Sequence, residues 1–130
     1  MCIRDRIDVL EHVGFEEGHI VSSVHNIAHH GDLSRSDQTK YVIAKNVVNS
    51  FNDFVLEWDE KEIKTFINDK LIFSYPKNDQ PWERWPFDEK FHFILNIAIG
   101  GNWGGMKGID DTAFPTKMEI EHFRVYKKKT

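Results

Sequence analysis

Two acidic side chains near the start of the chain are the residues best suited to chemistry. Asp8 and Glu11 lie in the apolar stretch Ile7-Asp8-Val9-Leu10-Glu11. In a regular strand, residues three positions apart point to opposite faces, but a β-bulge at Val9-Leu10 would turn Glu11 to the face of Asp8. Two carboxyl groups on one face drive their pKa values apart, as acid/base chemistry requires. The alternative is two ordinary surface acids on a strand with one solvated side.

A second candidate site lies in residues 91–105. Residues 91–99 alternate, which predicts a strand with its bulky face in the core and Asn96 on a face that suits a polar ligand. The strand then runs into a loop with four glycines around Trp103, and glycine lets a ligand approach the backbone closely. The indole of Trp103 either stacks on a sugar ring or caps the core.

Composition limits the function classes. The 130 residues suffice for one domain, and a net charge of −4 with a single basic run in the tail, residues 127–130, argues against nucleic-acid binding. No apolar run is long enough for a membrane span, and a single Cys2 excludes an internal disulfide. The histidines at 25, 29 and 30 have no Cys or acidic partner at ligand spacing, so no metal site is expected.

The elements that position these residues all have strand character. Period-two patterns predict strands at 6–13, 19–26, 41–44, 54–58, 63–67, 70–75, 91–99 and 118–126. Asn68-Asp69 is a good hairpin turn, and residues 28–38 read as a polar surface loop. In the loop from residue 76 to 88, Trp82 and Trp85 either line a binding cleft, or Trp85 covers the end of the sandwich while Trp82 stays half exposed. The fold class is therefore all-β, an antiparallel β-sandwich.

Four stretches, in order, resemble glycoside hydrolase family 16, and most closely its laminarinase-type endo-β-1,3-glucanases. Residues 7–11 resemble the second part of the Glu-x-Asp-x-x-Glu signature of that family. The other three stretches are Ser23-Val24-His25, the run from Trp85-Pro86-Phe87-Asp88 through the glycine-rich loop, and Phe114-Pro115 with residues 118–126. The resemblance implies a partial concanavalin A-like jelly roll whose concave face binds β-glucan and cleaves it with retention of configuration.

The resemblance also implies roles for single residues. Glu11 matches the general acid/base and Asp8 the aspartate that assists it. The residues expected to contact substrate are His25, Asn96, Trp103 and Trp85. Glu121 stands where many members have an Asp that helps to bind a structural calcium, so that ion is left open and no other cofactor is expected. The resemblance further implies a secreted or periplasmic protein that is a monomer at full length and binds neither nucleic acid nor membrane.

One position departs from the family pattern. The nucleophilic Glu is expected at position 6, where this chain has Arg6. A guanidinium cannot attack the anomeric carbon, and its charge beside Glu11 is expected to favour the carboxylate and remove the proton that the acid must donate. The hypothesis is that residues 1–6 are foreign sequence or a truncated start, and that 7–126 are the C-terminal part of a catalytic domain. The isolated chain is then expected to aggregate or stay molten.

Two other functions stay open. The first is a non-catalytic β-glucan-binding module that kept the cleft and lost the nucleophile, which Arg6 favours. The second is a related family 16 activity on mixed-linkage glucan, agar or carrageenan. The spacing from Asp8 to Glu11 and the loop around Trp103 favour the laminarinase type.

Overall fold

The computed structural model describes residues 5–29, 38–44 and 46–129. The chain divides into two compact units, Met1–Phe93 and Ile94–Thr130, and each is described by itself. The six strands assigned within the described ranges all lie in the first unit. None of the helices in those ranges has the length and apolar character needed to cross a membrane. Most of the predicted loop at 28–38 falls outside the described residues.

The first sheet carries the acidic residues near the start of the chain. Its antiparallel strands, in the order β1-β2-β3, are β1 (Arg6–Glu11), β2 (His19–His25) and β3 (Thr39–Ile43). A short 3-10 helix, η1 (Ile27–His29), follows β2. The turn predicted between the first two strands is present. Gly18 is needed there because its φ is +77° and a Cβ atom would lie 3.1 Å from the carbonyl oxygen of Ala44.

The second sheet is a meander of three antiparallel strands in the order β4-β5-β6. They are β4 (Phe54–Trp58), β5 (Glu62–Ile67) and β6 (Lys70–Pro76). The predicted hairpin at Asn68 and Asp69 is confirmed, since both residues have positive φ, 47° and 64°. Along β5 the side chains alternate between half-buried and buried, as expected for a sheet with one face in a core.

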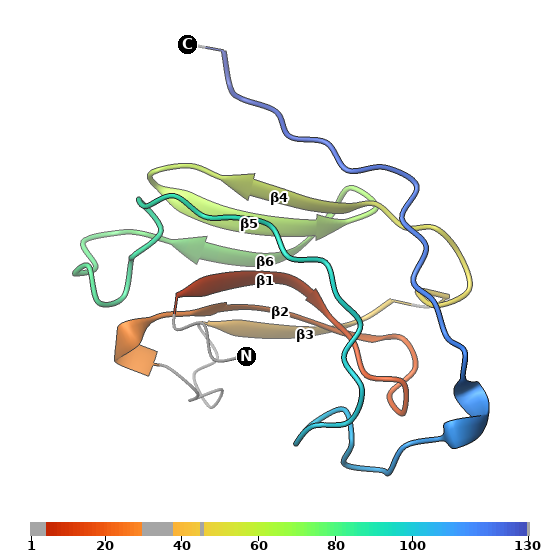
Figure 1. The fold of residues 1–130 in the computed structure, drawn as a ribbon. Coiled ribbons are helices and arrows are strands. Elements are labelled where there is room, and N and C mark those ends of the chain that lie inside the picture. Colours follow the sequence, from red (N-terminus) through yellow and green to blue (C-terminus); the bar gives the residue numbers. More distant parts are fainter. Residues whose placement is uncertain (1–4, 30–37, 45, 130) are drawn as a thin grey trace. The chain divides into compact units, whose positions relative to one another are not determined.

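The core of the first unit lies between these two sheets, which Figure 1 shows as two sets of three arrows. Its fully or nearly fully buried members come from β2, β5, β6 and the loop after β6: Ile20, Val24, Ile63, Ile67, Ile72, Phe73, Tyr75, Trp85 and Phe87. One polar contact crosses the core, where the hydroxyl groups of Ser22 in β2 and Thr65 in β5 lie 2.8 Å apart with neither residue exposed. The unit is therefore a two-layer β-sandwich.

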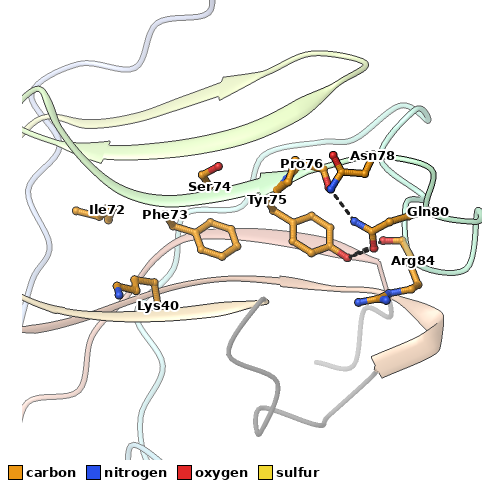
Figure 2. Close-up of a pocket in the computed structure, with 9 residues that line it drawn as sticks. All are labelled: Lys40, Ile72, Phe73, Ser74, Tyr75, Pro76, Asn78, Gln80 and Arg84. Atoms are coloured by element: carbon orange, nitrogen blue, oxygen red, sulfur yellow. Dashed lines mark hydrogen bonds between the residues drawn. The ribbon is translucent and has the colours of Figure 1, made fainter.

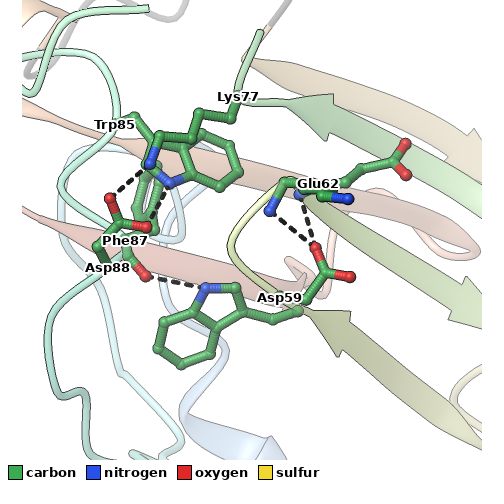
Figure 3. Close-up of polar contacts among 8 residues, drawn as sticks. Asp59, Glu62, Lys77, Trp85, Phe87 and Asp88 are labelled. Atoms are coloured by element: carbon green, nitrogen blue, oxygen red, sulfur yellow. Dashed lines mark hydrogen bonds and ion pairs between the residues drawn. The ribbon is translucent and has the colours of Figure 1, made fainter. Parts of the chain in front are cut away.

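The loop after β6 is fastened to the sandwich at both ends. At its start, Gln80 accepts a hydrogen bond from the Tyr75 hydroxyl at 3.0 Å and donates one to the Pro76 carbonyl at 2.7 Å (Figure 2). At its end, the Asp88 carboxylate accepts from the Trp85 indole at 3.1 Å and from the Lys77 ammonium at 2.7 Å (Figure 3). These contacts fix both ends of the loop, and the Asp88 carboxylate holds the Trp85 indole.

Residues 94–130 form no strand within the part that the structure describes, and their one assigned element is the 3-10 helix η2 (Asp111–Ala113). The strands predicted at 91–99 and 118–126 are therefore wrong. The alternating pattern favours an extended backbone, but a strand also needs a hydrogen-bonded neighbour, and none pairs with either segment here. The apolar side chains that were expected in the core are exposed to solvent, with Leu95 58% and Ile97 49% exposed.

Candidate active site

A β-bulge in β1 brings the two acidic residues to one face of the sheet. Asp8 pairs with Ser23 of β2 and Glu11 pairs with Val21, and the register shifts between the two pairs. Three steps along β1 therefore match two steps along β2, and the extra residue turns Glu11 to the side of Asp8. The bulge that the sequence predicted is confirmed.

His25 joins the two carboxyl groups. Its Nε2 atom lies 3.1 Å from Oδ2 of Asp8, and one ligand atom from each of Asp8, Glu11 and His25 lies within 4.8 Å of the other two. His25 is only 4% exposed, so its ring orientation is fixed by packing. Position 25 is two residues from Ser23, which faces Asp8 across the ladder, and the period of a strand puts both on the same face.

Ser23 is a member of this cluster that the sequence did not single out. Its hydroxyl lies 3.3 Å from Nε2 of His25 and hydrogen-bonds the Glu11 carboxyl, and the residue is fully buried. The signal that would have found it is the strand register, because once Asp8 is paired with Ser23 the hydroxyl must lie beside the acids. The register depends on the bulge and was not available from the sequence alone.

Arg6 lies on the same face, two residues before Asp8. Its Nε donates to Oδ2 of Asp8 at 2.8 Å, and the two side chains are 30% and 17% exposed. Asp8 thus accepts from the guanidinium and contacts the imidazole at one oxygen. Position 6 is therefore directed at the same group of side chains as positions 8 and 11.

The pKa of Glu11 is raised above its ordinary value. Burial is the largest cause and the negative charge of Asp8 the second, while Arg6, His25 and the hydrogen bond from Ser23 act in the opposite direction. The charge of Arg6 lowers the Glu11 pKa, as expected, but burial and the charge of Asp8 outweigh it, so the net shift is upward. A carboxyl group whose pKa is raised holds its proton more readily, which suits the role of a general acid.

Trp85 does not fit the prediction that it contacts substrate. It is 2% exposed, its ring stacks on Tyr75 at 5.7 Å between centroids, and Phe87 meets it edge-on at 5.3 Å. A ring covered in this way has no face to offer a sugar. The alternative, that Trp85 covers the end of the sandwich and Trp82 is exposed, agrees with the 60% exposure of Trp82.

Asn96 and Trp103 belong to the second unit, and the structure does not place them relative to Asp8 and Glu11. Asn96 is exposed, and Trp103 is half-buried in a glycine turn. The glycines in that turn are needed, since a Cβ atom on Gly105 would lie 2.7 Å from the carbonyl oxygen of Gly101. That Asn96 and Trp103 contact substrate stays a prediction.

Two other features of the described residues are candidate sites besides the cluster of Asp8, Glu11 and His25. A hollow of about 530 Å³ is lined mainly by β6 and includes Arg84 and Lys40 (Figure 2), but no carboxylate lines it.

Glu121 is 72% exposed and contacts only His122, at 3.6 Å, among the ion pairs of the described residues. It belongs to no group of three ligands there, so nothing in the structure supports a calcium ion at Glu121. Among the described residues, the cluster of Asp8, Glu11 and His25 is the group suited to acid/base chemistry.

Comparison with known proteins agrees with this arrangement. The family model of glycosyl hydrolases family 16 matches residues 3–122. The chain belongs to glycosyl hydrolase family 16. The match covers both acidic residues and every strand of the two sheets.

Several relatives of this family 16 chain are β-glucan hydrolases by name. A β-glucanase of Rhodothermus marinus is 36% identical in an alignment 128 residues long, which covers 93% of this chain and 44% of that protein. The laminarinase structure from the same organism superposes with a TM-score of 0.77 at 36% identity, covering 84% of this chain and 45% of that one. A point mutant of SCLam, a non-specific endo-β-1,3(4)-glucanase that was crystallised with a glucan oligosaccharide at its active site, has a TM-score of 0.74 at 27% identity, with coverages of 84% and 42%.

The solved relatives identify the fold as the family 16 jelly roll, of which this chain matches a part. The chain spans a little under half the length of the Rhodothermus marinus relatives and less of several others. Their activities and substrates therefore concern proteins more than twice its length, and reach this chain only as proposals.

Proposed function

We propose that this chain binds laminarin-type β-1,3-glucan across the face of β1 and β2 that carries Asp8, Glu11 and His25. The observation that carries the proposal is the bulge, which gathers two carboxyl groups and an imidazole on one face of the sheet. The printed descriptions of the relatives, a laminarinase and an endo-β-1,3(4)-glucanase among them, support β-glucan as the ligand.

In a chain with a carboxylate at position 6, Glu11 would be the general acid/base. Its protonated carboxyl would donate to the glycosidic oxygen while the position-6 carboxylate bonds to the anomeric carbon and the bond to the leaving sugar breaks. The Glu11 carboxylate would then take a proton from the water that displaces the glycosyl ester. Asp8 assists, because its negative charge helps to hold the proton on Glu11 between these steps. His25 fixes the Asp8 carboxylate through the contact of 3.1 Å.

A retaining mechanism also needs a nucleophile about 5–5.5 Å from the acid. Position 6 shares the face of Asp8, and Arg6 occupies it with a group that cannot form a glycosyl ester. The native chain is therefore expected to bind glucan without cleaving it, and hydrolysis is expected to require a carboxylate at position 6.

The experiment measures laminarin binding by calorimetry and the release of reducing ends for three forms: the native chain, Arg6→Glu and Arg6→Gln. All three are expected to bind, and only Arg6→Glu is expected to release reducing ends. The double variant Arg6→Glu/Glu11→Gln is expected to lose roughly 10²–10⁴-fold of that rate, the usual contribution of a general acid.

The outcomes separate the rival functions. Binding by all forms without cleavage by Arg6→Glu would favour a non-catalytic β-glucan-binding module. Absence of laminarin binding in every form would overturn the proposal. Parallel titrations with mixed-linkage glucan, agar and carrageenan test the other family 16 substrates.

A further inference from the structure

The cluster on β1 and β2 combines the ligand types that divalent transition metals prefer. Asp8 and Glu11 supply carboxylate oxygens, and His25 supplies the imidazole nitrogen Nε2. Imidazole nitrogen with carboxylate oxygen suits Zn²⁺, whereas Ca²⁺ and Mg²⁺ are bound through oxygen atoms. No metal site was expected at His25 from the sequence, because the acids and the histidine are far apart along the chain and meet through the pairing of β1 with β2.

The geometry is close to that of a bound metal. Two ligands on a tetrahedral zinc ion, at bond lengths near 2.1 Å, lie about 3.4 Å apart. Nε2 of His25 is 3.1 Å from Oδ2 of Asp8, and the three ligand atoms all lie within 4.8 Å of one another. Bringing the three atoms to zinc-bonding distances would require rotation of the Glu11 and Asp8 side chains and displacement of the Arg6 contact to Asp8.

The surroundings hold the nitrogen ligand in place. The His25 side chain is 5% exposed, and the fully buried Ser23 hydroxyl lies 3.3 Å from the same Nε2. A ligand whose ring is fixed in this way loses little conformational entropy when it binds an ion. The Asp8 side chain, at 17% exposure, leaves an approach for the ion from solvent.

Arg6 is the group that opposes a cation. Its Nε donates to Oδ2 of Asp8 at 2.8 Å, so the guanidinium occupies one ligand atom and places a positive charge beside the site. A metal ion must displace this contact.

We propose that Asp8, Glu11 and His25 form a binding site for one Zn²⁺-type divalent ion, with Arg6 limiting its affinity. The site uses side chains of the glucan-binding face, so a bound ion blocks glucan there. That second consequence rests on the proposed function, whereas metal binding itself does not.

The test is a calorimetric titration of the full 130-residue chain, free of any histidine tag, with ZnCl₂ at pH 7.5. One equivalent is expected to bind to the native chain. His25→Ala is expected to weaken that affinity at least tenfold, because a nitrogen ligand is lost. The matched control is His19→Ala, which removes an exposed histidine from the same strand and is expected to leave the affinity unchanged.

Arg6→Gln gives the most distinctive result. It removes the positive charge and frees the Asp8 oxygen, so zinc affinity is expected to rise by about tenfold or more. A purely structural role for Arg6 would not produce a gain. CaCl₂ in place of ZnCl₂ is expected to give no binding of comparable affinity.

Two results would overturn the proposal. One is the absence of a stoichiometric zinc event in both the native chain and Arg6→Gln. The other is binding that His25→Ala leaves unchanged, which would place the ion elsewhere. If His25→Ala fails to fold, NMR of the native chain decides instead: zinc must shift the ring resonances of His25 and not those of His19. A laminarin titration with and without zinc then tests whether the two ligands compete. If they do not compete, only the claim that they share one face is contradicted, and metal binding itself is not.

Discussion

Residues 54–76 and residues 91–126 carry the same kind of alternating apolar pattern, yet only the first region forms a sheet. In the first, each strand has a neighbour across a turn of two or three residues, and Ile63 and Thr65 are fully buried. In the second, Ile97 and Ile99 are 49% and 62% exposed, and no strand is assigned. The difference shows that alternation sets which face a side chain would take, whereas burial depends on a partner strand.

The largest expected effect comes from one substitution made in both regions. Ile63→Ala removes a fully buried side chain between the two sheets and is expected to lower the free energy of unfolding by about 2–5 kcal/mol. Ile97→Ala changes an exposed side chain and is expected to stay within about 0.5 kcal/mol. Urea unfolding followed by tryptophan fluorescence measures both. Equal costs would mean that residues 94–130 are packed in solution as tightly as the sandwich.

A smaller effect is expected at the polar contact inside the core. Thr65→Val removes the contact of 2.8 Å from the Ser22 hydroxyl, which still donates to the Asp8 carbonyl, at an expected cost of about 0.5–1.5 kcal/mol. Because Ser22 also lies 3.2 Å from the carbonyl oxygen of Asp8, the loss is expected to shift the amide signals of β1 near the bulge. The matched control is Thr112→Val, an exposed threonine of the second unit, which is expected to leave both the stability of the sandwich and the β1 signals unchanged. A double variant Ser22→Ala/Thr65→Val that costs the sum of the two single changes would show that the hydroxyl groups are not coupled.

The sequence predicted those elements whose local signals agree with one another. The strands at 54–58, 63–67 and 70–75 match the structure to within one residue, because Asn68 and Asp69 fix the register of the hairpin and the alternation agrees with it. The bulge between Asp8 and Glu11 was one of two interpretations of the sequence, the other being two ordinary surface acids, and the structure has the bulge. At 91–99 the pattern alone could not say whether a neighbouring strand would be available.

At the site, residue identities were easier to predict than their surroundings. Asp8, Glu11 and His25 do meet on one face, but the sign of the Glu11 pKa shift depends on how much burial opposes Arg6, and burial is a property of the folded sheet. Trp85 was misjudged for the same reason, because aromatic residues suit both a core and a sugar-binding surface. Export of the protein and its monomeric state stay predictions.

The most direct test of the account is an NMR titration of the Glu11 carboxyl in the native chain and in Asp8→Asn. The account holds that burial and the charge of Asp8 raise the pKa of Glu11, so it predicts a native pKa above the ordinary value and a lower one in Asp8→Asn. Because the folded state then holds this proton more tightly than the unfolded state, the contribution of Glu11 to stability is expected to fall as pH rises from the unfolded pKa to the folded one. A Glu11 pKa at or below its ordinary value, unchanged in Asp8→Asn, would contradict the claim that the bulge builds an acid/base pair.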